Sequence, residues 1–528
     1  MRSSPLTALI LTVAAAAVGA PTLAAQSGGS LAQRIQQVMR RPAFAHAEWG
    51  VEFYSLDNGK PVYAHNADKF FVPASTTKLL TEGTTLALLG PDYRFTTRVY
   101  RTGPVDSAGT LDGDLVLVAS GDPDLSNRIQ PDGSLAFENE DHAYDGSPDT
   151  KAVPGDPLMV IRDFARQVKQ HGIRRVTGRV RVDVSLFPEG ERELGTGVVI
   201  SPVIVNDNLI DVTIGPGAQV GDPVTIAPSP ATAYARFINL ATTAPADSTP
   251  RIRWSDDVAN EDGTHTVTVT GQFPLGTAPI LYAYAVPEPS QYAAVTLAEA
   301  LAQEGVTATW PARGDDVDFA ALAPRYTPDA VVAEHVSPPL KEDVRITLKV
   351  SQNLHASTMP YELGALVAHE GTAQAGFDLE HAFLEKAGLD LSGASQADGA
   401  GGSAHFTPDF MVHYLAYMAK QPFFQIFHDA LPVLGKDGTL WNIQVDSPAA
   451  GHVHAKTGTF GAPDHLNRML MVTAKGLAGY VTTVAGRHLA FAIYVNNVEV
   501  SRDDPDAVTK IVGQALGEIA AAGYEARR

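Results

Sequence analysis

The spacing of three short polar motifs is the feature of this 528-residue sequence that most restricts its fold. Ser75 and Lys78 form an S-x-x-K motif, and Ser351-Gln352-Asn353 begins 276 residues after Ser75. Lys456-Thr457-Gly458-Thr459 begins only 105 residues after Ser351. The shorter interval suits one helical subdomain, whereas the longer one can hold an additional folded unit. If the motifs meet at one site, extra domains must lie between the first and the second.

Composition excludes several classes of function. A net charge of −20 and a pI near 5.2 argue against nucleic acid or an anionic membrane surface as the main partner, because summed repulsion opposes docking. The chain has no cysteine, which excludes disulfides, thiolate nucleophiles and Cys-ligated metal sites. Covalent catalysis would therefore depend on Ser, Thr, Lys or a carboxylate.

The first 25 residues have the pattern of a secretory signal peptide. Basic Met1-Arg2 precedes an apolar run over 6–18 and the small pair Ala24-Ala25. An uncleaved anchor is the alternative. No later stretch reaches about 18 uninterrupted apolar residues, so we expect no stable membrane span after cleavage. These features predict an exported protein that is periplasmic or secreted.

The hydrophobic pattern predicts helices and strands at both ends of the chain and β-rich units in its middle. Near the N-terminus we expect a helix over 31–39, a hairpin with strands over 49–56 and 62–64, and a helix with Ser75 at its mouth. The stretch 127–157 is polar, acidic and rich in Gly, Pro and Asp, which predicts a long surface loop or insertion. Further elements are expected over 115–119, 158–170, 176–183, 209–214, 251–270, 344–350, 453–457 and 489–496, with helices beginning at Thr407-Pro408 and Asp504-Pro505.

Ser75 and Lys78 can act together as a nucleophile and its base. Residues three apart on a helix share a face and lie within mutual reach. A lysine can take the serine proton if burial or another cation lowers its pKa. Backbone N–H groups at the helix mouth can in addition stabilise a developing oxyanion.

The other two motifs offer a relay and a substrate-binding strand. Ser351 supplies a second hydroxyl for proton relay, and Asn353 supplies an amide that can hydrogen-bond a peptide. Lys456 and the hydroxyls of Thr457 and Thr459 can bind a carboxylate, while Gly458 lets substrate approach the backbone. The order S-x-x-K, S-x-N, K-T-G is typical of penicillin-recognising serine enzymes.

Over most of its length the sequence resembles the D-alanyl-D-alanine carboxypeptidase/endopeptidase family, the class C low-molecular-mass penicillin-binding proteins. The segments that carry the resemblance are 73–78, 113–123, 201–208, 349–353, 431–440, 455–459 and 476–481. It implies an α/β (α+β) fold with a β-lactamase/transpeptidase-like domain, an antiparallel sheet flanked by helices, formed by 26–100 and 335–528. Two smaller, mainly β domains would be nested within 101–334.

The resemblance also implies roles for the motif residues. Ser75 would be the acylated nucleophile, Lys78 its base and Ser351 a relay. Substrate would be bound by Asn353 and by the strand that carries Lys456, Thr457, Gly458 and Thr459. The backbone N–H groups of Ser75 and Thr459 would form the oxyanion hole. The partners implied are peptidoglycan stem peptides and, as covalent inhibitors, β-lactam antibiotics, with neither cofactor nor metal.

Departures from the family pattern keep two alternatives open. The family usually has the sequence Asp-Gly-Ser-Gly-Leu-Ser in one loop, where Ala400 removes a hydroxyl in this chain. The stretches 127–157 and 461–475 look like insertions that can border the cleft. A non-catalytic peptidoglycan-binding scaffold is one alternative. A β-lactamase-type hydrolase is the other, although we find no glutamate-bearing deacylation loop and the first interval is long for a single lactamase domain.

Several histidines and aspartates could suggest a metal site, but we do not assign one from the sequence. His452 and His454 lack a third ligand in the sequence, so we interpret them as structural. We interpret His355 as a packed or solvated residue, and Asp122 and Asp124 as parts of an Asp-Pro turn.

Overall fold

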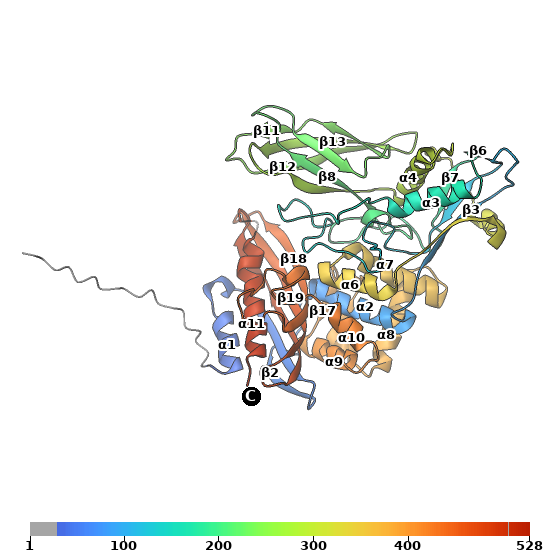
Figure 1. Cartoon of the computed structure of the whole chain (residues 1–528). Coiled ribbons are helices and arrows are strands. Elements are labelled where there is room, and N and C mark those ends of the chain that lie inside the picture. Colours follow the sequence, from blue (N-terminus) through green and yellow to red (C-terminus); the bar gives the residue numbers. More distant parts are fainter. Residues whose placement is uncertain (1–28, 505, 528) are drawn as a thin grey trace, which may run out of the picture.

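The computed structural model of the protein describes residues 29–504 and 506–527 (Figure 1). The predicted signal peptide, 1–25, lies outside the described residues. Within the described part, no helix combines the length and apolar character needed to cross a bilayer.

An antiparallel sheet built from both ends of the chain forms the base of the molecule. Its strand order is β18-β19-β20-β1-β2, with β21 also pairing to β19. The strands are β1 (Glu48–Ser55), β2 (Lys60–His65), β18 (Val453–Asp464), β19 (Met469–Thr482), β20 (His488–Asn496) and β21 (Val498–Ser501). β20 lies in the middle of this order. Each of its residues after His488 is buried, so both of its faces are covered.

Helices cover both faces of this sheet. α1 (Leu31–Met39) packs on α11 (Gln514–Tyr524), which contacts β18 and β19. On the other face α9 (Pro408–Met418) contacts β1, β19 and β20. Behind α9 lie the other helices of this layer: α2 (Lys78–Leu89), α6 (Leu340–Val350), α7 (Asn353–Leu363), α8 (Ala373–Lys386) and α10 (Phe424–Asp429). Figure 1 shows these two helical layers on either side of the sheet.

The inserted region leaves and rejoins this base through two paired strands. β3 (Thr96–Arg101) pairs antiparallel with β15 (Val331–Val336), and β5 (Leu115–Val118) and β7 (Val180–Asp183) complete a four-stranded sheet. β3 and β15 thus lie close to the domain limits that the sequence predicts, between 100 and 101 and between 334 and 335. That division of the chain stays a prediction.

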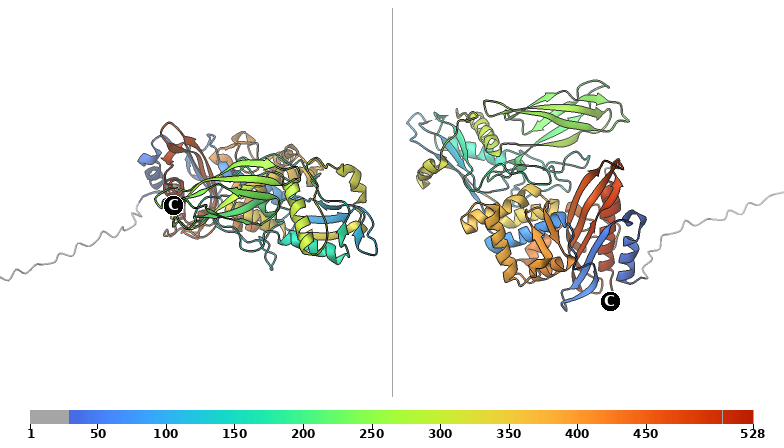
Figure 2. Two further views of the ribbon diagram at one scale, coloured as in Figure 1. Left: turned by 90° about the horizontal axis from the view of Figure 1, so that it is seen from above. Right: turned by 180° about the vertical axis from the view of Figure 1, so that it is seen from behind.

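The rest of the insertion is mainly β structure. One sheet has the order β14-β8-β9, and another has the order β10-β13-β11 with β12 paired to β13. Figures 1 and 2 show these strands above the base. The strands are β8 (Leu209–Gly215), β9 (Thr225–Ser229), β10 (Ala235–Asn239), β11 (Thr242–Ala244), β12 (Arg251–Ala259), β13 (His265–Pro274) and β14 (Ile280–Ala285).

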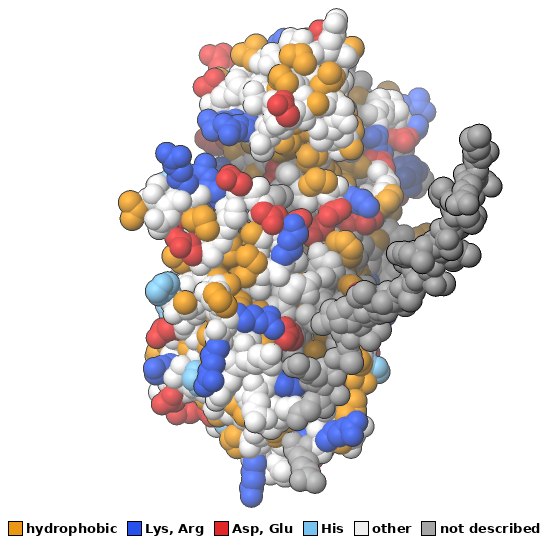
Figure 3. Space-filling model, turned by 90° about the vertical axis from the view of Figure 1, so that its left-hand side faces the viewer, with side chains coloured by type: hydrophobic (Ala, Val, Ile, Leu, Met, Phe, Trp, Pro, Cys, Tyr) orange, Lys and Arg blue, Asp and Glu red, His pale blue; other side chains and the backbone are white. Residues whose placement is uncertain are grey.

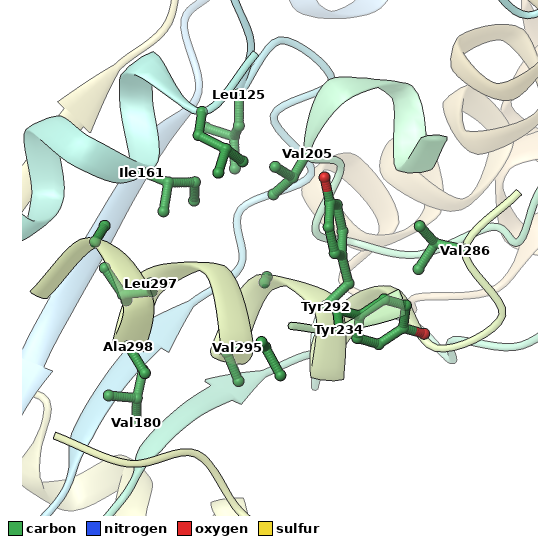
Figure 4. Close-up of a cluster of buried hydrophobic side chains, with 14 of the residues drawn as sticks. Leu125, Ile161, Val180, Val205, Tyr234, Val286, Tyr292, Val295, Leu297 and Ala298 are labelled. Atoms are coloured by element: carbon green, nitrogen blue, oxygen red, sulfur yellow. The ribbon is translucent and has the colours of Figure 1, made fainter. Parts of the chain in front are cut away.

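One hydrophobic cluster joins the two halves of the insertion. The helix α4 (Pro289–Gln303) contacts α3 (Met159–Gln170) and β7, and it carries Tyr292, Val295 and Leu297 into the cluster. Figure 4 shows Tyr292 beside Tyr234, with ring centroids 5.2 Å apart. Buried residues of the four-stranded sheet and of the two other sheets of the insertion all belong to this cluster. The parts of the insertion therefore pack against one another.

The structure corrects in part the prediction that 127–157 is a long surface loop or insertion. The described residues of this stretch form no helix or strand, but Arg128, Asp141 and His142 are buried. The guanidinium of Arg128 donates to Asp141 and to Asp207, at 2.6 Å in each case. The polar composition that indicated exposure instead supplies a buried hydrogen-bonded network.

Most local predictions are confirmed. α1 has the expected bounds, and Asp57-Asn58-Gly59 turns between β1 and β2, with Gly59 at a φ of 67°. The stretch 461–475, which looked like an insertion, extends β18 and β19 into a long hairpin. The overall class, an antiparallel sheet flanked by helices with a mainly β insertion, is as expected. On the face shown in Figure 3, acidic and basic side chains are interspersed.

Candidate active site

A tight turn presents Ser75 to solvent while its neighbours are buried. Ser75 lies in the 3₁₀ turn η2 (Ala74–Thr77), directly before α2. Ala74 has a φ of 46°, in the left-handed region that non-glycine residues seldom adopt. Such strain is held only where surrounding structure fixes it. The turn therefore places the Ser75 hydroxyl at a defined position.

Lys78 is fully buried at the centre of the site. Its Nζ is 2.9 Å from Ser75 Oγ and 2.6 Å from Asn353 Oδ1. It also lies 3.4 Å from Ser351 Oγ and 3.3 Å from the carbonyl oxygen of Ala400. Burial lowers the pKa of Lys78 to about 7, opposed by the negative charges of Glu193, Asp398 and Glu82. A large fraction of the amine is therefore neutral near pH 7.

Ser351 bridges the two lysines of the site. It ends α6 with a φ of 65°, and its Oγ accepts a hydrogen bond from Lys456 Nζ at 2.8 Å. Lys456 is fully buried and also donates to the carbonyl oxygen of Thr457. Burial and the neighbouring Lys78 hold the pKa of Lys456 well below its usual range. The Lys456 amine thus faces the Ser351 hydroxyl rather than the open cleft.

Asn353 begins α7 and is bonded to Lys78. Its Oδ1 accepts from Lys78, and the Tyr144 hydroxyl lies 3.2 Å from the same oxygen. Tyr144 also donates to the backbone carbonyl of Ser351. The Asn353 carbonyl is therefore engaged within the protein, and its amide nitrogen packs against Gly195, where a Cβ would be 2.0 Å away.

The loop that contains Ala400 keeps its shape without the missing hydroxyl. Asp398 Oδ1 accepts backbone hydrogen bonds from Ala400, Gly401 and Gly402, at 2.6–3.1 Å. The Ala400 carbonyl oxygen in turn accepts from Lys78. The departure from the family pattern therefore preserves the backbone contact with the base.

Gly458 allows the K-T-G strand to lie against the nucleophile turn. A Cβ at this position would be 2.3 Å from the carbonyl oxygen of Pro73 and 3.1 Å from the backbone nitrogen of Ser75. Close contact with the protein's own backbone therefore explains why residue 458 is glycine, in addition to any approach of substrate. On either side, Thr457 Oγ1 donates to Thr439 Oγ1 at 2.7 Å, and Thr459 Oγ1 accepts from Lys475 Nζ at 2.6 Å.

A cleft of about 230 Å³ opens beside Ser75. It is lined by motif residues and by both stretches that the sequence marked as insertions: Ser75, Ser351, Thr457 and Thr459 from the motifs, Asn139, Glu140, Asp141 and Tyr144 from one stretch, and Lys475 from the other. The expectation that these stretches border the cleft is confirmed. The sequence did not single out Tyr144, Glu140, Lys475 or Trp441 as site residues, because no motif surrounds them.

The histidines outside the motifs have structural contacts. The rings of His454 and His428 stack at 4.1 Å, and those of His452 and Tyr524 at 4.9 Å. His355 is fully buried between Asp343 and Asp207. His355 is thus packed rather than solvated, whereas the structural interpretation of His452 and His454 stays a prediction.

Fold and site together define a serine hydrolase of the penicillin-recognising class. Residues 31–516 match the model of the D-Ala-D-Ala carboxypeptidase 3 (S13) family, so the chain belongs to that family and is a serine DD-peptidase. The resemblance stated from the sequence is confirmed.

Individual relatives agree with this assignment. A D-alanyl-D-alanine carboxypeptidase of Actinomadura sp. (strain R39) is 29% identical, over 96% of this chain and 88% of its own length. The carboxypeptidase DacB of Haemophilus influenzae is 24% identical, over 86% of each chain. The crystal structure of Haemophilus influenzae penicillin binding protein 4 superposes with a TM-score of 0.70 at 21% identity, covering 93% of this chain and 99% of that one. That similarity shows the same fold.

The substitution Gly458→Ala tests the contact between the strand and the nucleophile turn. Because its Cβ would meet the Pro73 carbonyl, the turn must shift, and a displacement of this kind reduces catalysis by about 100-fold. We expect a loss of that order in the rate of acylation by a chromogenic β-lactam. Gly461→Ala in the same strand is the control, since its Cβ would lie no closer than 3.1 Å to any neighbour. Equal rates in the two variants would contradict the prediction.

Proposed function

We propose that this enzyme cleaves peptidoglycan stem peptides through an acyl-enzyme on Ser75, acting as a carboxypeptidase on D-Ala-D-Ala ends, as an endopeptidase on D-alanyl cross-links, or as both. The observation that carries the proposal is the 2.9 Å contact between Lys78 Nζ and Ser75 Oγ at a lysine whose pKa is about 7. A neutral amine at hydrogen-bond distance is what a serine nucleophile requires for activation.

In the proposed acylation, Lys78 takes the proton of Ser75 as Oγ attacks the carbonyl carbon of the penultimate D-alanine. The backbone N–H groups of Ser75 and Thr459 stabilise the oxyanion. The proton then passes through Ser351 Oγ, which contacts both lysines, to the departing amine. Water attacks the ester carbonyl in the second half of the reaction, and the hydroxyl of Ser75 is restored.

We assign substrate binding to the K-T-G strand and to Asn353. We propose that the Asn353 N–H₂ group and the Gly458 backbone bind the peptide, and that Thr457 and Thr459 hold its terminal carboxylate. Lys456 acts through Ser351, because its amine is buried and already bonded there.

Lys475 adds a cation that the motifs do not contain. Among the described residues that line the cleft, it is the one Lys or Arg side chain. It is half-buried, its pKa is lowered to about 8 by burial, and it donates to Thr459. At neutral pH it is mostly protonated, so we propose that it supplies the charge that recognises the substrate carboxylate.

β-Lactam inhibition and export complete the proposal. A structure of the Haemophilus influenzae penicillin binding protein 4 is described as complexed with a novel β-lactam, and it has a TM-score of 0.67 and 20% identity with this chain. This supports β-lactams as covalent inhibitors. The N-terminal pattern over 1–25 supports a signal peptide and a periplasmic or secreted enzyme, where its substrate lies.

Mass spectrometry of the intact protein after incubation with a penicillin tests the nucleophile. We expect a stable adduct on the wild type and none on Ser75→Ala, together with a loss of D-alanine release from a stem pentapeptide of about 10⁴-fold or more. If the wild type neither forms an adduct nor releases D-alanine, the scaffold alternative holds. Rapid loss of penicillin without an accumulating adduct would instead identify a β-lactamase.

The pH dependence of acylation tests Lys78 as the base. Since only the neutral amine accepts the proton, activity is present above its pKa and lost below it. We expect the acylation rate constant to fall about tenfold per pH unit below about pH 7 and to level off above it. Lys78→Ala should abolish acylation and leave the melting temperature close to that of Ser75→Ala. A rate independent of pH from 5 to 8 would remove Lys78 from this role.

Lys475→Gln tests carboxylate recognition. We compare kcat/KM for a D-Ala-D-Ala peptide with kcat/KM for the same peptide carrying a C-terminal amide. Loss of a charged hydrogen bond should reduce the preference for the free carboxylate about tenfold or more. Lys341→Gln, on the surface in an ion pair with Asp92, is the matched control. An unchanged preference in Lys475→Gln would contradict the role.

A further inference from the structure

Five carboxyl groups lie buried together behind the catalytic lysine. Each is at most 2% exposed, and they come from three helices and the segment that follows β5: Glu82 from α2, Asp122 and Asp124 from the segment, Asp343 from α6 and Glu362 from α7. Buried acids of this kind normally have charged or hydrogen-bonding partners.

Seven oxygens of these groups have no hydrogen-bond partner among the described residues. They are both carboxylate oxygens of Glu82 and of Glu362, with Asp122 Oδ2, Asp124 Oδ1 and Asp343 Oδ2. Leaving one buried acceptor unpaired costs roughly 1–3 kcal/mol, so seven in one place require an explanation. A bound cation that several of these oxygens coordinate at once would explain why they have no other partner.

Two of the acids, Asp124 and Asp343, are close enough to share such a cation. One possible ligand atom from each of Asp124, Asp343 and His355 lies within 4.8 Å of the other two. The charge of Asp343 also raises the pKa of each of the other four carboxyl groups. Burial raises these pKa values as well, that of Asp122 to about 7.

The nearby cations are too few for five acids, and Arg128 is bound outside the cluster. His355 donates from Nδ1 to Asp343 Oδ1 at 2.7 Å and contacts Asp207 Oδ1 through Nε2 at 3.1 Å. Arg128 is bonded to Asp141 and Asp207. His335 Nε2 is 3.6 Å from Asp122 Oδ2, but burial lowers its pKa, which favours the uncharged ring. Despite its burial, Asp343 and Asp207 raise the pKa of His355 well above its usual range, so among the described residues His355 supplies one positive charge against five carboxyl groups.

We propose that this cluster binds one calcium ion, with the unpartnered oxygens of Asp124 and Asp343 as its central ligands. Asp122 and Glu362 complete the oxygen shell, and His355 holds Asp343 in orientation. An all-oxygen set selects a hard divalent cation. Calcium accepts six to eight oxygens in flexible geometry, whereas magnesium usually keeps several waters, for which a fully enclosed site is poorly suited.

The ion would join parts of the fold that come from distant sequence. It connects the inserted segment at Asp122 and Asp124 with α6 and α7, the two helices between which Ser351 lies. Its role is structural, since none of its ligands touches Ser75. Because the ligands are buried, we expect calcium to be taken up during folding and to exchange slowly afterwards.

The test is calcium content and stability after refolding. Full-length protein is unfolded in guanidinium with EDTA, refolded with or without calcium, dialysed and analysed by elemental mass spectrometry. We expect one equivalent of calcium, a melting temperature several degrees higher with calcium, and loss of at least 90% of the calcium in Asp124→Asn and Glu362→Gln. Glu380→Gln is the matched control, because Glu380 is equally buried, with its pKa raised to about 8, but lies on α8 outside the cluster.

Each other outcome overturns the proposal. Wild type that refolds with less than 0.1 equivalent of calcium and the same melting temperature in both conditions has protonated acids or water at this place. Calcium kept equally by Asp124→Asn and Glu362→Gln lies elsewhere. Retention of magnesium in preference to calcium contradicts the choice of ion. If the variants do not fold, the wild-type comparison with and without calcium decides alone.

Discussion

The buried amine of Lys78 is the interaction on which the active site depends. It is 0% exposed and is bonded at once to Ser75, to Asn353 and to the Ala400 carbonyl, three segments far apart in sequence. Burial has a catalytic consequence and a structural one. It lowers the pKa so that the amine can accept a proton, and it requires every neighbouring acceptor to be in place.

The inserted region takes part in the site through polar contacts. Tyr144 donates to the carbonyl of Ser351, so a residue far from the motifs supports the left-handed turn in which Ser351 lies. On the other side of that turn, Gln352 donates to Asp207, which also binds Arg128. The insertion between the first two motifs therefore holds the second motif in position.

Local sequence sufficed wherever short-range geometry decides the structure. The S-x-x-K spacing places Lys78 within reach of Ser75, and Asp-Asn-Gly requires the hairpin turn between β1 and β2. Tyr144 and Lys475 were not predicted, because their positions depend on how distant segments pack. For the same reason, composition wrongly indicated an exposed loop at Arg128, whose partner Asp207 is 79 residues away.

The acid cluster and the base are electrostatically linked through Glu82, one helical turn after Lys78 on α2. The charge of Glu82 raises the pKa of Lys78, against the effect of burial. Burial and Asp343 in turn raise the pKa of Glu82 itself well above its usual range, which favours its uncharged form at neutral pH. An uncharged Glu82 raises the Lys78 pKa less than a charged one. A cation among the neighbouring acids acts in the same direction on Lys78, because positive charge disfavours the ammonium form. Burial therefore keeps Lys78 near neutrality, because the neighbouring Glu82 opposes it only weakly when uncharged.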